Sequence, residues 1–492
     1  MPTLHAPWET RPLPETDSSP PAQHPWRRVS ILSLLLLIGI GLYITMIALF
    51  PQMQNFLIVW LLCFAPYGAG CAFVFLTKQS AGRWRWIELG LIFAGALIFR
   101  AMLLPLPPNL SHDSWRYLWD ARVTLHGYSP YVYAPENPLF NMLHDFIYDN
   151  SRYRNTPTLY PPGAEGLYLL SYLLAPSNLF FLKGIFMVFD MATCGALAWL
   201  LARRGHDPRR AIIYAWCPLP IVEFAIQGHV DVITITLMVL AVLCATSTFR
   251  GSRLLLGFII GLATLTKIYP IFLLVVVMRR KDWALLVVCA LTVIGGYLPY
   301  YILGHGNIYG YFAKYASQQG GNAGIIQLVT WQIFHIPHLD FAYVVQRQHY
   351  AEAMFAGLMA LLVVVLRLLK NISMEAAIML LSGAVFAISS HVFPWYAAAL
   401  LPWVALLVGP LWTRKRVRGS GLAVAAAWYF TGITIISYFP PFSTTVNWQP
   451  YYDYVYYVVL TGLALALIIG FWNEFKRFHR LTVEGTHDTA KH

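Results

Sequence analysis

Long apolar stretches, separated by short polar segments, run along almost the whole chain. Many have about 17 to 25 residues, enough for one helix to cross a hydrocarbon core about 30 Å thick. A helix also satisfies its own backbone hydrogen bonds inside lipid. The pattern therefore predicts an all-α, polytopic bundle of about 12 to 14 transmembrane helices. The spans are expected at 30–50, 56–76, 86–106, 179–202, 209–226, 230–247, 254–267, 269–279, 283–303, 350–369, 374–390, 393–411, 420–438 and 453–472.

Two apolar segments are too short for a simple span. The stretch 164–175 is punctuated by Pro and Gly, so we expect it to lie at the interface or to re-enter the membrane. A single long helix over 254–279 would carry the basic run 279–281 to the outer side, against the positive-inside rule. A helical hairpin with Lys267 at its outer tip is therefore preferred.

Two long segments interrupt the apolar pattern. The first, 107–162, carries several acidic residues and many Trp and Tyr side chains, and the second, 304–348, is rich in Gly, Gln, Tyr and His. Loops of such length are usually functional or disordered, and the aromatic side chains favour order at the membrane surface. We expect a single transmembrane domain, 29–472, between a disordered tail, 1–28, and a C-terminal tail, 473–492.

Composition agrees with a membrane protein. Hydrophobic residues make up 58% of the chain and charged residues 11%, against about 25% charged in soluble domains. The net charge is +12, and alternating the spans places most of the Lys and Arg on one side. This distribution predicts a multi-pass protein with both termini cytoplasmic, and it argues against a nucleic-acid partner. The expected location is the plasma membrane. The cysteines show no CxxC spacing, and the absence of a DxD pair gives no sign of a divalent metal.

The first outer loop begins with a candidate catalytic helix. The segment 111–122 follows two prolines and ends before Gly127, which predicts a short helix with Asp113, Arg116 and Asp120 on one face. A membrane-bound lipid phosphate and a water-side acceptor could both reach a carboxylate at this position, so Asp113 is a candidate general base. Two alternatives stay open: Asp113 caps the helix, or the three side chains form a surface ion-pair ladder of little energetic weight.

Further polar side chains occur at the outer ends of later hairpins. Lys267 is a candidate for neutralising a lipid phosphate, or else a lysine that only anchors its span. His229 and Asp231 either line the same site or form a polar turn. His391, with Trp395 and Tyr396 after it, offers a hydrogen-bond donor and a stacking surface for a sugar, or is incidental.

These segments together resemble the GT-C class of integral membrane glycosyltransferases, particularly polyprenyl-phosphomannose-dependent mannosyltransferases and glycosyltransferase family 87. The strongest piece runs from His112-Asp113 through Tyr117-Leu118-Trp119-Asp120-Ala121-Arg122-Val123 to Gly127-Tyr128-Ser129-Pro130-Tyr131-Val132-Tyr133-Ala134-Pro135. Later landmarks are Tyr160-Pro161-Pro162, Gly228-His229-Val230-Asp231, Lys267-Ile268-Tyr269-Pro270 and Pro394-Trp395-Tyr396. One departure is that His112 stands where members of the class often carry a second acid.

The resemblance implies an inverting transfer of a hexose, mannose by likeness, from a polyprenyl-phosphate carrier to a lipid-linked or cell-envelope glycan at the exoplasmic face. It implies Asp113 as base, and no cofactor, because the lipid-phosphate sugar is a substrate. Charge on the leaving phosphate would be stabilised by Lys267, Arg122, Arg116 and His391. The expected substrate-binding residues are His112, Asp120, Tyr128, Tyr131, Tyr160, His229, Asp231, Tyr269, Trp395 and Tyr396.

Two rival functions remain at this point. Paired short helices and Asp190 in the middle of a span are also features of secondary transporters, although a hydrogen bond to a neighbouring helix would explain Asp190 as well. The polar candidates cluster at the outer surface instead of the midplane, which favours the enzyme. A non-catalytic protein that binds a lipid-linked glycan is the other alternative.

Overall fold

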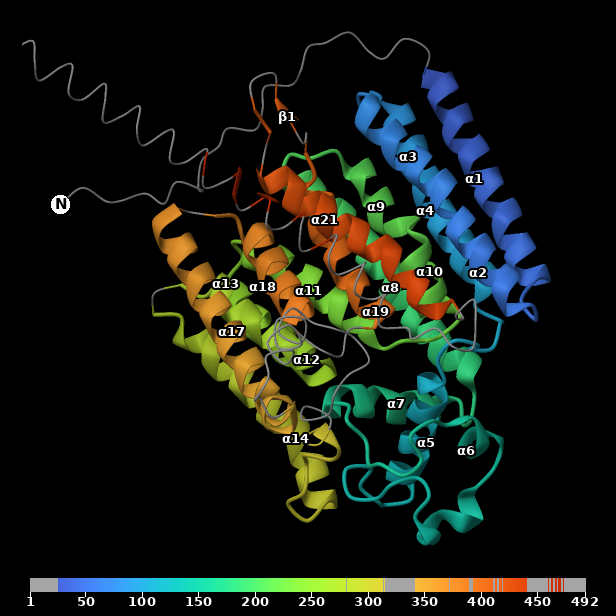
Figure 1. Cartoon of the computed structure of the whole chain (residues 1–492), viewed down its shortest axis with the longest axis vertical. Coiled ribbons are helices and arrows are strands. Elements are labelled where there is room, and N and C mark those ends of the chain that lie inside the picture. The colour runs from blue at the N-terminus through green and yellow to red at the C-terminus, as the bar shows by residue number, and fades with distance from the viewer. Residues whose placement is uncertain are drawn as a thin grey trace, which may run out of the picture.

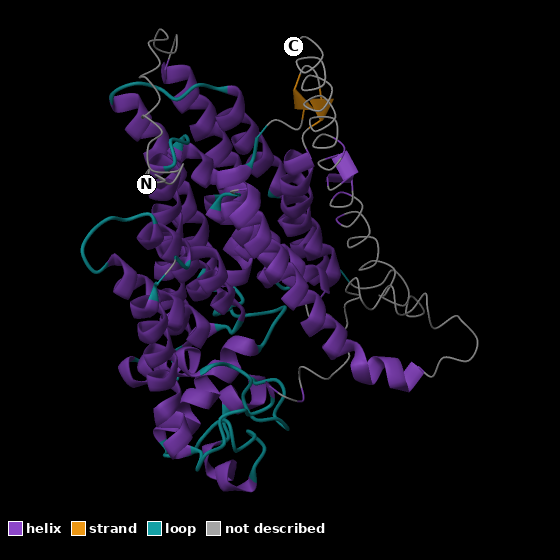
Figure 2. Ribbon diagram, turned by 90° about the vertical axis from the view of Figure 1, so that its left-hand side faces the viewer, coloured by secondary structure: helices purple, strands orange, loops and turns teal. Residues whose placement is uncertain are grey.

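The computed structural model describes residues 25–279, 281–312, 314, 341–370, 372–388, 393–409, 412–413, 416–417 and 419–439, with single helical residues at 459, 462, 465, 466, 468, 469 and 472. Figure 2 shows that these residues are almost entirely helical, with many of the loops gathered at one end of the bundle. The predicted tails 1–28 and 473–492 and the predicted span 453–472 lie largely or wholly outside this part of the chain.

The helices of the N-terminal half are α1 (Pro25–Ala48), α2 (Met53–Leu62), α3 (Phe64–Leu76), α4 (Arg83–Leu103), α5 (Asp113–Leu125), η1 (Pro138–Leu143), α6 (Phe146–Asn150), α7 (Pro162–Leu174), α8 (Leu179–Arg203), η2 (Pro208–Ala211), α9 (Ile212–Ala215), α10 (Pro218–Ala225) and α11 (Asp231–Ala245). Those that follow are α12 (Ser252–Thr266), η3 (Tyr269–Phe272), α13 (Leu273–Val277), α14 (Trp283–Leu303), α17 (Phe341–Lys370), α18 (Met374–Ile388), α19 (Pro394–Ala397), η4 (Ala398–Leu400), α20 (Leu401–Leu407), α21 (Gly419–Ile433) and η5 (Thr434–Tyr438). Two short strands, β1 (Trp412–Thr413) and β2 (Arg416–Val417), form one antiparallel pair.

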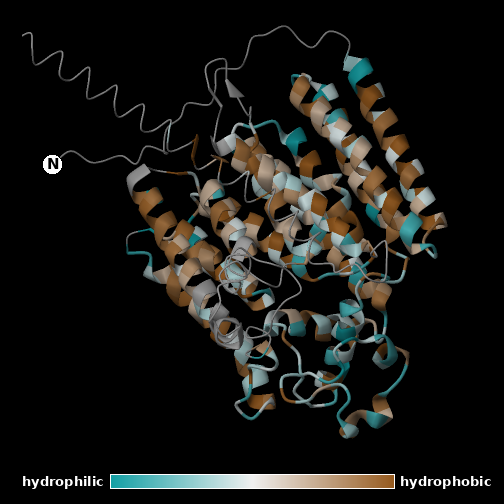
Figure 3. Cartoon of the chain, in the orientation of Figure 1, coloured by the Kyte–Doolittle hydropathy of each residue, from teal (hydrophilic) through white to brown (hydrophobic). Residues whose placement is uncertain are grey.

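The expected polytopic helical bundle is confirmed. Within the described residues, six helices are long and apolar enough to cross a membrane, and five shorter apolar helices accompany them. Figure 3 shows hydrophobic residues along the long helices and more hydrophilic ones in the segment that holds α5 and α6. The number of 12 to 14 spans stays a prediction.

Proline changes two of the predicted spans. The segment 209–226 is not one helix: it divides into η2, α9 and α10, and α10 begins at Pro218. The segment 393–411 likewise divides into α19, η4 and α20, with Pro394 and Pro402 in the first turns of α19 and α20. A proline has no backbone N–H to donate, so it interrupts a continuous helix and is tolerated in a first turn. In contrast, α17 begins earlier than the predicted span 350–369, at Phe341.

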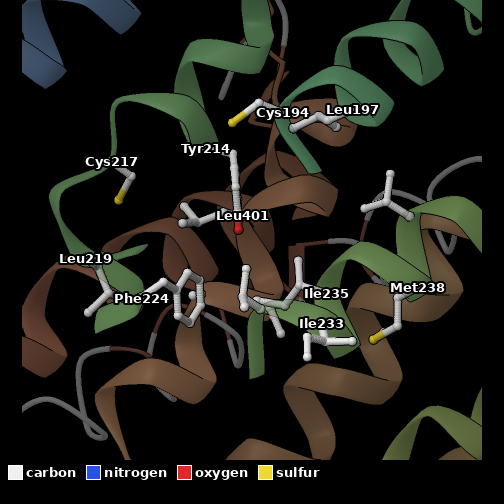
Figure 4. Close-up of a cluster of buried hydrophobic side chains, with 14 of the residues drawn as sticks. Cys194, Leu197, Tyr214, Cys217, Leu219, Phe224, Ile233, Ile235, Met238 and Leu401 are labelled. Atoms are coloured by element: carbon white, nitrogen blue, oxygen red, sulfur yellow. The ribbon is translucent and has the colours of Figure 1, made fainter. Parts of the chain in front are cut away.

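The core lies where α8, α9, α10, α11 and α20 meet. Figure 4 shows Leu197 of α8, Tyr214 of α9 and Leu401 of α20 among the side chains that converge there. These side chains are fully buried. The broken helices α9 and α10 therefore belong to the interior of the bundle and not to its lipid-facing surface.

The predicted hairpin around Lys267 is confirmed. Arg253 at the start of α12 forms an ion pair with Asp282, and it donates a hydrogen bond to the carbonyl oxygen of Val277 at 3.0 Å. The start of α12 and the end of α13 therefore lie at the same end of the bundle. Lys267, between η3 and α12, lies at the opposite end.

Basic residues gather at one end of the bundle, as the charge pattern predicts. Arg209 lies 2.7 Å from Glu88, which also pairs with Arg28 at 3.3 Å, and Arg204 lies 2.5 Å from Glu375. The segment 107–162 and α7 occupy the other end, where α7 runs crosswise to the long helices (Figure 1). This placement agrees with the prediction that 164–175 is not a span.

Asp190 in the middle of α8 has a structural partner. Its carboxylate lies 2.6 Å from Arg100 Nε of α4 and accepts a hydrogen bond from the Tyr214 hydroxyl at 2.7 Å. Arg100 also donates to the carbonyl oxygen of Ala215 at 2.7 Å. A carboxylate that is costly inside a membrane is thus neutralised between three helices, and the structure gives it no exposure that a transported ion would need.

Replacing Arg100 by leucine is expected to destabilise the fold by about 3–5 kcal/mol, because the buried Asp190 carboxylate then has no counter-ion. The measurement is the unfolding free energy in detergent micelles. The double variant Arg100→Leu/Asp190→Leu is the control, and it should recover most of the loss. A single variant as stable as the wild type would contradict the assignment.

Candidate functional site

The predicted base begins α5. Asp113 is the first residue of this helix and His112 is the N-cap, without any side-chain capping bond. The Asp113 carboxylate instead accepts a hydrogen bond from the Tyr160 hydroxyl at 3.3 Å, and the side chain is 19% exposed. The alternative that Asp113 caps α5 is therefore wrong.

Two polar side chains fix the segment that leads to Asp113. The amide oxygen of Gln227 accepts hydrogen bonds from three consecutive backbone N–H groups, at Asn109, Leu110 and Ser111, over 3.0–3.2 Å. Lys183 of α8 donates to the carbonyl oxygen of Leu106 at 2.5 Å and to that of Ile226 at 3.3 Å. The connection from α4 to α5 is therefore bound to the turn between α10 and α11.

That turn packs closely on its neighbours. Gly228 has φ +69°, and a Cβ atom there would lie 3.0 Å from Lys183 Cγ and 3.2 Å from Ser114 Cβ. Only glycine adopts this backbone conformation without strain and also leaves the space. The turn thus places His229 directly beside the start of α5.

Lys267 reaches the same region from α12. Its ammonium nitrogen lies 3.3 Å from Asp231 Oδ1, 4.6 Å from the centre of the Tyr396 ring and 5.5 Å from that of Tyr160. The side chain of Lys267 is 14% exposed. Such a lysine is held by a carboxylate and two aromatic rings, so it is more than a span anchor.

Tyr160 stands between the base and the lysine. Its hydroxyl binds Asp113, and its ring faces Lys267. The approach of α7 to α12 explains this position: a Cβ atom on Gly163 would lie 2.7 Å from Leu265 Cβ and 2.9 Å from the Leu265 carbonyl oxygen. Tyr131 also holds Tyr160 in place, because its hydroxyl donates to the Tyr160 carbonyl oxygen at 2.6 Å.

His229 lies on the other side of Asp113. Its Nδ1 is 3.9 Å from Asp113 Oδ2, and its Nε2 is 3.4 Å from Glu223 Oε2. The Trp395 ring stacks on the imidazole, with centroids 3.7 Å apart and planes at 12°. Two of the later landmarks thus meet at the start of the first loop: Gly228-His229-Val230-Asp231 and Pro394-Trp395-Tyr396.

Burial governs the electrostatics of the base. It raises the pKa of Asp113 above its usual range, while the Lys267 charge and the hydrogen bond from Tyr160 oppose the rise. The exposed Arg152 of the first loop also favours the carboxylate form. A raised pKa moves a carboxylate toward the range in which it serves as a general base near neutral pH.

The two predicted arginines bind within the first loop and to α7. Arg116 Nε donates to Asp120 Oδ1 at 2.7 Å, and its terminal nitrogens donate to the carbonyl oxygens of Tyr153 and Thr156 at 2.8 and 2.9 Å. Arg122 donates to Asp145 Oδ2 at 2.8 Å and to the Tyr172 hydroxyl at 3.0 Å. These contacts are buried or half-buried.

The alternative that Asp113, Arg116 and Asp120 form a surface ion-pair ladder is therefore wrong in two respects. The Arg116–Asp120 pair is almost fully buried, and Asp113 interacts with Tyr160 and His229 instead of Arg116. Nothing in these contacts directs Arg116 or Arg122 toward Lys267. The contacts of both arginines order the first loop, and their predicted role in phosphate binding stays a prediction.

Three of the remaining predicted site residues have partners of their own in the structure. His112 Nδ1 lies 3.0 Å from the carbonyl oxygen of Asn150, so it must carry the proton there. Tyr128 packs edge to face on Tyr133 and Phe140 inside the loop. Tyr269 follows Lys267 and stacks with Phe272. His391 lies outside the described residues, so its predicted role at the leaving phosphate stays a prediction. The roles of His112, Tyr128 and Tyr269 in substrate binding also stay predictions.

The comparison with known families decides the class of protein. Residues 158–394 match the model of glycosyltransferase family 87. The match covers just under half of the chain and indicates a glycosyltransferase. No curated protein sequence matches the chain. The resemblance to family 87 stated from the motifs is thereby confirmed, and the matched range includes Tyr160, His229, Asp231 and Lys267.

Asp113 precedes the matched range of the glycosyltransferase, and Trp395 and Tyr396 follow it. The structure nevertheless joins all three residues to the matched part through Tyr160, His229 and Lys267. Among the described residues no group of three or more His, Cys, Asp and Glu side chains is arranged to hold a metal ion. The expectation of a metal-independent enzyme stays a prediction.

Three residues around this site escaped the sequence analysis: Lys183, Glu223 and Gln227. Each is a polar side chain in or beside an apolar stretch, and each is almost completely buried. A charged or amide side chain in a span is costly and points to a function or a specific partner. That signal was present in the sequence, but it does not reveal which segments the side chains contact.

Proposed function

We propose that this glycosyltransferase moves a hexose, with mannose as the first candidate, from a polyprenyl-phosphate carrier to a hydroxyl group of a glycan or glycolipid acceptor, with inversion at the anomeric carbon. The observation that carries the proposal is the position of Asp113 and Lys267 on two sides of Tyr160. A base and a cation are therefore close together at one end of a helical bundle, where a lipid-borne phosphate and a polar acceptor meet.

In the proposed reaction, Asp113 removes the proton of the acceptor hydroxyl as that oxygen attacks the anomeric carbon. The bond from this carbon to the phosphate oxygen breaks, and the electron pair leaves on the phosphate. Lys267 stabilises the leaving phosphate from a position already fixed by Asp231 and the Tyr396 ring. Preorganised charge of this kind is a large part of enzymatic rate enhancement.

The orientation in the membrane is part of the proposal. The basic ion pairs around Arg28, Arg204 and Arg209 lie at the end opposite Asp113. By the positive-inside rule that end would be cytoplasmic and the Asp113 end exoplasmic, and the plasma membrane is the proposed location. The two termini would then be cytoplasmic.

The transporter alternative loses one of its two supporting features. Asp190 was the midspan acid that favoured it, and this side chain is bound to Arg100 and Tyr214 inside the core. We therefore develop no second function. A protein that transports or only binds a lipid-linked glycan is kept as an outcome of the test.

Purified protein in lipid vesicles, supplied with labelled polyprenyl-phosphomannose and candidate glycolipid acceptors, tests the proposal. The expected result is label covalently attached to an acceptor, with loss of the donor. Label that enters the vesicle lumen without a covalent product would favour transport. Label that is bound but released unchanged would favour a binding protein, and either outcome would overturn the proposed reaction.

A further inference from the structure

The imidazole of His229 joins Asp113 to a second, buried acid. The two ring nitrogens point to opposite sides, Nδ1 toward Asp113 Oδ2 at 3.9 Å and Nε2 toward Glu223 Oε2 at 3.4 Å. At these distances the two nitrogens and Glu223 Oε2 are buried polar atoms without a hydrogen bond. Catalytic hydrogen bonds are often long in a structure without substrate and tighten in the complex.

The ring of His229 is fixed in its plane. Trp395 stacks on one face at 3.7 Å, and the His229 backbone N–H donates to the carbonyl oxygen of Glu223 at 3.2 Å. Burial and the nearby Lys267 charge hold the pKa of His229 well below its usual range. A neutral imidazole carries one N–H and one lone pair, so the partner of one nitrogen decides which atom faces Asp113.

Glu223 has the surroundings of an uncharged acid. Its side chain is fully buried, and its Oε1 accepts a hydrogen bond from the Tyr438 hydroxyl at 2.9 Å. The Tyr438 ring stacks on Trp60, which holds the hydroxyl in place. Among the described residues no Lys or Arg side chain forms an ion pair with Glu223, and the carboxylates Asp113 and Asp231 belong to the same cluster. A buried carboxylate without a cation is costly, so the protonated acid is the stable form.

We propose that Glu223 is a positioning residue that acts as a protonated acid: its Oε2–H donates to His229 Nε2, which places the Nδ1–H of His229 toward the Asp113 carboxylate. The inference rests on the proposed function and names the groups that tune its base. The network runs in one direction, from Tyr438 to Glu223 to His229 to Asp113, and it gives a partner to each of the three orphaned atoms. The Asp113 carboxylate then accepts hydrogen bonds from the Tyr160 hydroxyl and from His229 Nδ1–H. It keeps a lone pair for the hydroxyl group of the sugar acceptor.

This arrangement predicts that a glutamine amide can take over the role of the Glu223 acid. In Glu223→Gln the amide N–H donates to Nε2 and the amide oxygen accepts from Tyr438, so kcat should stay within about threefold of the wild type. In Glu223→Leu nothing donates to His229 Nε2, so the hydrogen bond from Nδ1–H to the Asp113 carboxylate is no longer fixed; kcat should fall about 10- to 100-fold, the factor for one hydrogen bond to a charged group. The KM for the sugar donor should not change, because the proposal gives Glu223 no contact with that substrate.

The pH profile gives a readout that a merely structural role would not move. A hydrogen bond to a carboxylate favours its charged form, so losing the Nδ1–H donor raises the pKa of Asp113 further. In Glu223→Leu the acidic limb of kcat/KM should therefore move up by about one pH unit. In Glu223→Gln it should coincide with the wild type. Asp231, Lys267 and Tyr438 also face this cluster and are unchanged in both variants.

The matched control is Glu165→Gln, a second fully buried glutamate, which accepts a hydrogen bond from Thr158. It should leave both kcat and the pH limb unchanged. A Glu223→Gln variant as inactive as Glu223→Leu would show that an ionised carboxylate is required and overturn the inference. Wild-type activity in both Glu223 variants would overturn it as well.

The ¹⁵N chemical shifts of His229 separate this inference from the proposed function. In protein labelled at histidine, with His229→Gln to assign the signal, the wild type and Glu223→Gln should show a neutral ring protonated at Nδ1. A ring protonated at Nε2, or a cation, would refute the role of Glu223 whether or not any sugar is transferred. If the wild type gives no product but shows the Nδ1–H form, the proposed reaction fails while the hydrogen-bond network stands.

Discussion

Replacing Asp113 by asparagine is expected to lower the rate of sugar transfer by about 10²- to 10⁴-fold, the range that a general base contributes. The amide has the shape of the carboxylate and still accepts from the Tyr160 hydroxyl, which lies 3.3 Å from Asp113 Oδ2. It has no lone pair basic enough to take the proton of the acceptor. Transfer of label from polyprenyl-phosphomannose and donor binding should be measured on the same preparation, and donor binding should persist.

The control for this substitution is Asp149→Asn. Asp149 belongs to the same loop, and its side chain is 73% exposed, with only a 4.0 Å contact to Arg154. An exposed pair of this kind contributes little, so both activity and stability should stay at the wild-type level. Undiminished transfer by Asp113→Asn would eliminate Asp113 as the base and leave the enzyme without an assigned proton acceptor.

Replacing Lys267 by methionine should lower kcat for sugar transfer by about 10²- to 10³-fold, as the loss of one preorganised stabilising group does in other enzymes. Methionine keeps much of the apolar stem but removes the cation that is proposed to face the leaving phosphate. It also leaves Asp231, now 3.3 Å from the ammonium nitrogen, as an uncompensated negative charge. Steady-state kinetics with varied donor concentration measure the effect.

Two further variants define what Lys267 contributes. Lys267→Arg keeps the positive charge and should recover part of the activity. Lys281→Met removes an exposed lysine at the opposite end of the bundle and should have no effect. If Lys267→Met retained full kcat and full donor affinity, the phosphate would have to be stabilised by other cations, and the proposed site would be misplaced.

The spans show how far the apolar pattern predicts this fold. The helices α1, α4, α8, α11, α12 and α14 begin and end within a few residues of the predicted limits, because each needs only a continuous apolar stretch to satisfy its backbone in lipid. The segments 209–226 and 393–411 differ, since Pro218 and Pro394 start new helices there. Their prolines were visible in the sequence, but hydropathy alone does not say whether a proline kinks a span or divides it.

The site shows which contacts the sequence could not predict. Spacing placed Asp113 and Arg116 on one helix face, yet Asp113 stands at the helix start and faces Tyr160 and His229, while Arg116 reaches the carbonyl oxygens of the loop. The family resemblance implied that Arg122 binds the leaving phosphate, and this role stays a prediction; in the structure the ion-pair partner of Arg122 is Asp145. A helical period defines which side chains are neighbours on one element, but not which other element covers them.

The amino-acid pattern alone predicts a membrane bundle with its candidate side chains at one end, because membrane thickness and the distribution of charge constrain every span locally. It also gave the resemblance to family 87 through short motifs. The folded arrangement alone shows that Lys267 lies beside Tyr160, that Gln227 binds the segment leading to Asp113, and that Glu223 lies behind His229. Those contacts join residues far apart in the chain, and their geometry depends on close packing such as that of Gly163 on Leu265, which no local pattern encodes.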